Sequence, residues 1–130
     1  MMARLVVDTN VVSYLLKGDT RAGLYRRQLN GRELCVAFPT DAELYRSAVQ
    51  LGWGQTRIDA LRAMPAGYTL LVYDDETAWA WARVMCIKGH TMAPGDAWVA
   101  AAALRHGLPL VTHNRRHFDP VPGLNVISEA

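Results

Sequence analysis

Acidic and amide side chains stand at four points where the sequence predicts that a strand ends or a helix begins. They are Asp8, Glu43, Asp96 and Asn114. Several carboxylates in one place repel each other, and a divalent cation among them offsets that repulsion. Carboxylate and amide oxygens suit hard cations such as Mg²⁺ or Mn²⁺. If the fold brings the four positions together, they could form a site for such a cation.

Asp8 ends an apolar, β-branched run at residues 5–7, which is typical of a strand covered on both faces. In open α/β sheets, ligands bind outside the carboxyl ends of the strands, so its position makes Asp8 a candidate site residue. Asp8 could equally cap the helix that follows, because aspartate favours helix starts. This stretch by itself leaves both interpretations open.

Each of the other three residues also has a structural interpretation. Thr40 and Glu43 match the capping box, in which the glutamate folds back onto the backbone N–H of the threonine. Asp96 could complement the dipole of the helix that it opens, and Asn114 could be a turn residue that tolerates an unusual backbone conformation. The acidic run at residues 74–76 is interpreted as a helix cap, and the four histidines as surface or loop residues.

The elements that would position these residues alternate between strands and helices. Strands are expected at residues 5–7, 33–38, 69–73, 108–112 and 124–127. Helices are expected at residues 11–17, 21–29, 41–51, 57–64, 74–88 and 97–106. This alternation predicts a three-layer α/β domain, with a parallel sheet between two layers of helices. The candidate residues would then face one crevice at the carboxyl edge of the sheet.

Composition restricts the class of protein. A chain of 130 residues, with 51% hydrophobic and 20% charged residues, predicts one globular domain that covers residues 1–130. Its apolar runs are too short for a membrane span and no signal-peptide pattern precedes the first strand, so a cytoplasmic protein is expected. All but two of the 14 basic residues are arginine, which suits a polyanionic partner. Cys35 and Cys86 lie in apolar patterns and are expected to be reduced core thiols.

Four ordered segments resemble the PIN-domain family, and within it the VapC-type endoribonuclease toxins of VapBC toxin–antitoxin systems. The segments are Val-Asp-Thr-Asn at 7–10, Thr-Asp-Ala-Glu-Leu at 40–44, Gly-Asp-Ala-Trp-Val-Ala-Ala-Ala-Ala-Leu at 95–104, and Leu-Val-Thr-His-Asn at 110–114 followed by Phe118 and Pro-Gly-Leu at 122–124. Each is weak alone, but together they cover nearly the whole chain in order. The resemblance implies a Rossmann-like PIN domain, hydrolysis of RNA phosphodiester bonds with Mg²⁺ or Mn²⁺, homodimerisation, and inhibition by a small cognate antitoxin.

The resemblance also assigns the chemistry to particular residues. Asp8, Glu43 and Asp96 would hold the cation, which activates water and offsets the charge that grows on the phosphate. Asn114 would orient a water molecule or a neighbouring group. Many relatives have an aspartate where this chain has Asn114, and an acidic residue where it has His117. An amide contributes no charge, so a second cation would bind more weakly here.

Five further residues are expected to assist this site. Thr9, Asn10 and Thr112 would support the acids through hydrogen bonds. Arg115 and Arg116 lie beside the predicted crevice, where they could grip the RNA backbone.

Two other classes of function stay open. A haloacid-dehalogenase-like phosphotransfer domain would use Asp8 as a covalent nucleophile, but it would need a second aspartate where this chain has Asn10. A degenerate nuclease, kept as an RNA-binding or partner-binding module, would be consistent with Asn114. A third class, a DNA-directed flap-type nuclease, stays open too, although this chain lacks room for the extra helical elements that such enzymes carry.

Overall fold

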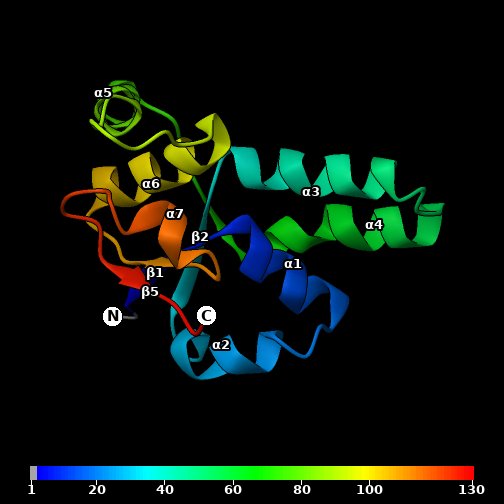
Figure 1. Cartoon of the computed structure of the whole chain (residues 1–130). Coiled ribbons are helices and arrows are strands. Elements are labelled where there is room, and N and C mark those ends of the chain that lie inside the picture. The colour runs from blue at the N-terminus through cyan, green and yellow to red at the C-terminus, as the bar shows by residue number, and fades with distance from the viewer. Residues whose placement is uncertain (1–2) are drawn as a thin grey trace.

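A five-stranded parallel sheet forms the centre of the fold (Figure 1). The computed structural model describes residues 3–130, for residues 65 and 66 without their side chains. The strands are β1 (Arg4–Val7), β2 (Glu33–Ala37), β3 (Thr69–Leu71), β4 (Leu110–Val111) and β5 (Val126–Ile127). Their order in the sheet is β3-β2-β1-β4-β5, so β1 lies in the middle. The carboxyl ends of β2 and β4 therefore flank Asp8, as the sequence predicts.

Helices cover both faces of this sheet. In chain order they are α1 (Thr9–Lys17), α2 (Ala22–Leu29), α3 (Pro39–Gln50), α4 (Gln55–Ala63), α5 (Asp75–Met85), α6 (Pro94–His106) and α7 (Arg115–Phe118), with a 3₁₀ turn η1 (Met64–Gly67) after α4. Figure 1 shows α3 and α4 side by side as a hairpin that projects beyond the sheet, and α5 lying over α6. No helix among residues 3–130 is long and apolar enough to cross a membrane.

The core has two parts, one on each face of β1. Val6 packs on the side of α6, while Leu5 and Val7 pack on the side of α1 and α2. All three side chains are fully buried, as expected of a central parallel strand. The alanines of α6 are buried as well, and their small side chains let this helix approach the sheet closely. This close contact fixes the start of α6 against the carboxyl edge of the sheet.

Several details of the sequence prediction are wrong. The strands expected at 69–73, 108–112 and 124–127 are shorter and cover Thr69–Leu71, Leu110–Val111 and Val126–Ile127. Residues 115–118 form the short helix α7, which the sequence did not predict. A single turn with one apolar residue has no hydrophobic periodicity that could be detected. The helix expected to reach Lys88 ends at Met85, where the N–H of Cys86 is shared among the last carbonyls. Cys35 is buried as predicted, but Cys86 is exposed because it lies at this helix end.

Candidate active site

Asp8 is a helix cap and a buried strand-end carboxylate at the same time. It is the N-cap residue of α1, and its Oδ1 accepts a hydrogen bond of 2.8 Å from the backbone N–H of Thr9. Its Oδ2 accepts a hydrogen bond of 2.7 Å from the hydroxyl of Thr112. The residue is 4% exposed. The cap interpretation is thus confirmed, and it leaves the carboxylate facing the edge where β1 and β4 end.

Burial raises the pKa of Asp8 to about 6, because the charged form is poorly solvated there. The negative charges of Asp96 and Glu43 raise it further, while the hydrogen bonds from Thr112 and Thr9 lower it. Burial also raises the pKa of Glu43, and Asp96 adds to that effect. The three carboxylates therefore lie close enough to repel one another.

Glu43 does not form the capping box that Thr40 suggested. Helix α3 begins at Pro39, a residue suited to the first helical position, so Thr40 already lies inside the helix. Thr40 is fully buried, and its hydroxyl oxygen lies 3.2 Å from the hydroxyl of Thr9. The helix starts earlier than the capping box requires, and Glu43 is free to face the carboxyl edge of the sheet.

Gly95 lets the start of α6 approach Glu43. A Cβ atom at Gly95 would lie 3.0 Å from Oε1 of Glu43, which is tighter than nearly all such contacts. The backbone φ of Gly95 is not positive, so this glycine is required by space rather than by conformation. The next residue is Asp96, so the same approach brings the second and third acids together.

His117 connects Asp96 with Asn114. The Nδ1 atom of His117 lies 3.0 Å from Oδ2 of Asp96 and 3.1 Å from Nδ2 of Asn114. These three side chains come from α6, α7 and the turn before α7. A histidine Nδ1 carries at most one proton, so it can donate to Asp96 when that proton is present. Sequence reasoning treated His117 as a loop residue and missed this contact, because α7 was not expected.

A cavity of about 230 Å³ opens beside this contact. Asp96 and His117 line it together with residues 90–93. The Nε2 atom of His90 lies 3.2 Å from the backbone oxygen of His117, which ties the loop before α6 to α7. Asp96 therefore has access to solvent through this cavity.

Thr112 and Asn10 connect the strand end to the turn that carries Asn114. The hydroxyl of Thr112 donates to Asp8 and accepts a 3.0 Å hydrogen bond from the N–H of Asn114. The amide oxygen of Asn10 accepts a 3.3 Å hydrogen bond from the N–H of His113. The backbone of Asn114 has a φ of −119° and a ψ of 52°, outside both the helical and the extended regions, as the turn interpretation allows, although its φ is not positive. These hydrogen bonds hold the turn at the acidic edge.

Arg115 and Arg116 lie on the exposed surface of α7. The Nε atom of Arg115 forms an ion pair of 3.2 Å with Asp119, one turn later. Both side chains are about half exposed, so such a pair contributes little to stability. The guanidinium of Arg115 stays available to an anionic ligand, and its contact with RNA stays a prediction.

The chemistry of the three acids fits a divalent cation, although their side chains are not yet arranged around one. Carboxylate oxygens are the ligands that Mg²⁺ and Mn²⁺ prefer, and a cation would offset the repulsion that helps to raise the pKa of Asp8. Within residues 3–130, no group of three or more histidine, cysteine, aspartate or glutamate side chains could hold a metal ion as placed. One carboxylate oxygen of Asp96, Oδ2, contacts His117.

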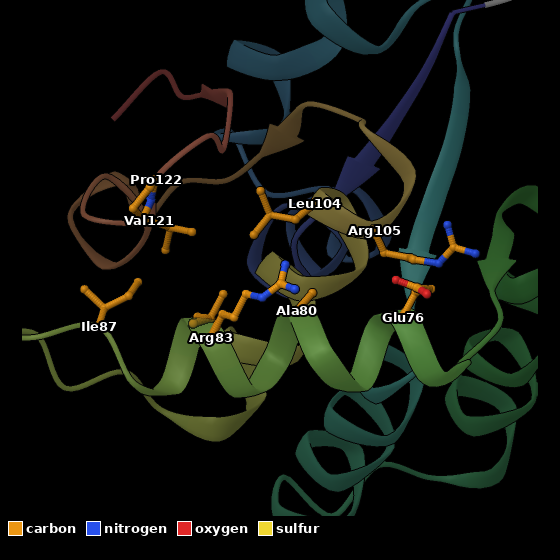
Figure 2. A pocket seen from close by; sticks show the side chains of 9 residues that line it. Glu76, Ala80, Arg83, Ile87, Leu104, Arg105, Val121 and Pro122 are labelled. Carbon is orange, nitrogen blue, oxygen red and sulfur yellow. The ribbon is translucent and has the colours of Figure 1, made fainter.

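A second, larger cavity lies away from the acids (Figure 2). It measures about 540 Å³ and lies between α5, α6 and the loop that contains Val121 and Pro122. Leu104 and Ala80 contribute to its apolar lining, and Arg83 approaches it from α5 (Figure 2). None of the three acids lines this larger cavity, so it is separate from the candidate site.

A family model described as PIN domain matches residues 5–124. The chain belongs to the PIN domain family. The resemblance that the four sequence segments predict is thereby confirmed, and it excludes the haloacid-dehalogenase-like interpretation. All four candidate residues lie within the matched part of this PIN domain.

Two curated relatives match this PIN domain over nearly its whole length. Ribonuclease VapC2 of Haemophilus influenzae is 29% identical over 126 residues, which cover 95% of this chain and 96% of the relative. The tRNA(fMet)-specific endonuclease VapC of Shigella flexneri is 25% identical over 126 residues, which cover 95% of this chain and 96% of the relative. The structure of VapBC2 from Rickettsia felis, bound to a DNA fragment from its promoter, has a similar fold. Its TM-score is 0.83 at 15% identity, with 98% of this chain and 99% of that chain covered. The predicted three-layer α/β fold is confirmed.

Proposed function

We propose that this PIN domain is a ribonuclease toxin that hydrolyses RNA phosphodiester bonds with the help of Mg²⁺ or Mn²⁺. One observation carries the proposal: Asp8, Glu43 and Asp96 come from three separate elements and meet at one edge of the sheet. Their mutual repulsion contributes to the raised pKa of Asp8. Such an arrangement destabilises the protein by itself, and it becomes useful when a cation binds.

Each residue has a distinct part in this proposal. Asp8, Glu43 and Asp96 hold the cation, which supplies activation of water and stabilisation of the charge on the phosphate. Thr112 fixes the carboxylate of Asp8 through its 2.7 Å hydrogen bond. Asn114, whose N–H is held by Thr112, orients a water molecule beside the acids.

Other parts of the chain complete the site. Thr9 bridges Asp8 and α3, because its N–H donates to Asp8 and its hydroxyl contacts Thr40. Asn10 holds the turn that follows β4. Arg115 and Arg116 bind phosphates of the RNA on either side of the scissile bond.

The proposal includes two protein partners. A small antitoxin would bind and inhibit the toxin, as the resemblance to VapBC systems implies, and two copies of the chain would form a homodimer. Exposed apolar side chains support such contacts, because Val49, Val72 and Trp79 are 78%, 75% and 59% exposed. Since the proposed substrate is cellular RNA, we expect the protein to act in the cytoplasm.

Cleavage of total RNA by the purified protein tests the proposed activity. We expect cuts in Mg²⁺ or Mn²⁺, no cuts in chelator, and loss of cleavage in Asp8→Asn, Glu43→Gln and Asp96→Asn. Asp59→Asn is the matched control, because Asp59 is an exposed acid on α4 and lies outside the proposed site. Transfer RNA is the first class to examine by end mapping, because the relative from Shigella flexneri carries that substrate in its name. Undiminished cleavage by Asp96→Asn, or cleavage that persists in chelator, would contradict the proposal.

A second candidate function is an RNA-binding module without catalytic activity. Two observations favour it. Residue 114 is an asparagine, whose amide carries no charge, and the Nδ1 atom of His117 contacts the carboxylate of Asp96. Such a module would bind RNA equally well with and without chelator and would never cut it. The cleavage assay above, repeated as a binding assay on the same RNA, separates the two functions.

A further inference from the structure

Four aromatic rings gather at the same edge of the sheet as the acids. Phe38 directly follows β2, Tyr73 lies two residues beyond β3, Trp98 lies near the start of α6, and Trp81 lies on α5. The ring of Trp98 meets those of Phe38 and Tyr73 edge to face, at centroid distances of 5.2 and 5.8 Å. Phe38 and Tyr73 also meet each other edge to face, at 6.1 Å. On the α5 side, Trp81 stacks on Trp98 at 4.7 Å with an interplanar angle of 14°.

Two of these rings are open to solvent. Phe38 is 38% exposed and Tyr73 is 52% exposed, whereas Trp98 and Trp81 behind them are half-buried. Edge-to-face and stacked contacts hold each ring in a fixed orientation. The exposed pair is therefore supported by the two tryptophans before any ligand arrives.

The aromatic cluster lies next to the acids, on the other side of the same helix start. Asp96 and Trp98 are two residues apart on α6, so with 3.6 residues per turn they point to nearly opposite sides. The two groups are separated by about one helix diameter, roughly 10 Å. Phe38 stands at the N-cap of α3, the helix that carries Glu43. We therefore expect an RNA strand that reaches the acids to pass close to these rings.

We infer that Phe38 and Tyr73, supported by Trp98, form a stacking platform for an unpaired nucleobase near the scissile phosphate. This inference rests on the proposed ribonuclease function and adds to it that the substrate is single-stranded where it is cut. Unpaired bases of RNA stack on aromatic side chains, and every base offers a face for such contact.

The charges around the platform favour a base over a phosphate. Asp74, which follows Tyr73, is paired with Arg105, but Asp75 and Glu76 lie two and three residues beyond Tyr73 and are exposed, so they repel the RNA backbone at this point. A nucleobase carries no charge and avoids this repulsion. The backbone would run on the opposite side of α6, toward Arg115 and Arg116 on α7. A second copy of the chain is the competing occupant, because Val72 beside Tyr73 is 75% exposed.

The test uses a short single-stranded RNA that the wild-type protein cuts, and versions of it with one abasic nucleotide at each position around the cut. We expect the abasic change to lower kcat/KM by roughly 5- to 150-fold at one or two positions near the cut. Tyr73→Ala and Phe38→Ala should lower kcat/KM for the intact RNA by a similar factor, and Tyr73→Phe should rescue most of that loss. In the alanine variants, the abasic change should have little further effect. Leu24→Ala is the control, because Leu24 is an exposed apolar residue on α2, outside the cluster.

Three results would overturn the inference. Wild-type rates for intact RNA in the Phe38→Ala and Tyr73→Ala double variant would show that the rings bind no base. A loss that is equal for intact and abasic RNA, together with a change from dimer to monomer in light scattering, would assign the rings to a second copy. A wild-type protein that cuts no RNA under any metal condition would refute the proposed function itself. The first two results leave that function intact.

Discussion

The Asp8 side and the Asp96 side of the acidic edge differ in how their carboxylates are held. Asp8 ends the central strand, is 4% exposed, and accepts hydrogen bonds from Thr9 and Thr112. The side chain of Asp96 is 28% exposed and contacts His117, whose own side chain is 53% exposed. The core of the protein therefore fixes one acid before any ligand binds, and a surface histidine holds the other.

In the proposed metal site, this difference would separate two tasks. The buried side would provide a ligand in a fixed place, at the expense of a poorly solvated charge. The open side would control access, because His117 competes with a cation for Oδ2 of Asp96. Substitutions on the buried side should therefore have large effects on activity and stability together. Substitutions on the open side should mainly change metal affinity.

The largest expected effect is that of Asp8→Asn. Activity should fall by about 10³-fold or more, because the amide is a neutral and weaker ligand. In chelator at pH 7.5 the variant should nevertheless be more stable to urea than the wild type, by about 1–3 kcal/mol. The folded-state pKa of about 6 lies above the ordinary value of 3.8, so the folded wild type loses stability as the pH rises from about 4 to about 6, and the full loss is present above that range.

Urea denaturation from pH 4 to pH 8 checks this sign. The wild type should lose stability between pH 4 and pH 7 relative to Asp8→Asn, and added Mg²⁺ should restore stability to the wild type alone. If the variant were less stable than the wild type at every pH, ionisation of the Asp8 carboxylate would not destabilise the folded protein.

Thr112→Val should have the next largest effect. The valine keeps the shape of the side chain but removes the hydroxyl that binds Asp8 and the N–H of Asn114. We expect activity to fall by about 10- to 100-fold and the free energy of unfolding by about 1–2 kcal/mol. Thr77→Val is the matched control, since the buried Thr77 makes the same kind of hydrogen bond to Asp74 at the start of α5. It should lose similar stability and keep its RNA cleavage rate.

Gly95→Ala should reduce activity without reducing stability. The added Cβ would displace the flexible end of Glu43, while alanine is a better helix former than glycine by about 0.5–1 kcal/mol. We expect a loss of about tenfold in kcat/KM at limiting Mg²⁺. Gly23→Ala on α2 is the control, because a Cβ there meets nothing within 4 Å. Equal rates for the two variants would mean that the position of Glu43 is unimportant.

The smallest expected effect is that of His117→Ala. Removal of the imidazole frees Asp96, so Mn²⁺ should bind a few times more tightly, by about 2- to 5-fold, while stability changes by less than about 0.5 kcal/mol. Calorimetric titration of Mn²⁺ into this variant and into His90→Ala, which changes another residue of the same cavity, measures the difference. Weaker Mn²⁺ binding in His117→Ala would instead make the histidine part of the metal site.

The sequence predicted the buried side of this edge better than the open side. The apolar run before Asp8 and the alanine-rich helix after Asp96 carry strong local patterns, and both elements lie close to their expected positions. Strand alternation then placed the acids on one edge, because parallel strands end together. These features depend on burial, which leaves a pattern in the chain.

The contacts of the open side left no comparable pattern. Helix α7 is a single turn of polar residues, so its existence and the contact of His117 with Asp96 depend on tertiary packing. The capping box at Thr40 was misread because Pro39 starts the helix earlier than that motif allows. The space requirement at Gly95 also became visible only when α3 and α6 were placed side by side.

Mn²⁺ binding by the wild type and three carboxylate variants tests the central claim most directly. The loss of the free Mn²⁺ signal in electron paramagnetic resonance reports binding without any RNA. If Asp8, Glu43 and Asp96 form one site, Asp8→Asn, Glu43→Gln and Asp96→Asn should each weaken binding at least about tenfold. Asp59→Asn should bind like the wild type. Equal Mn²⁺ affinity in all five proteins would contradict the account, because the three acids would then not act as one metal site.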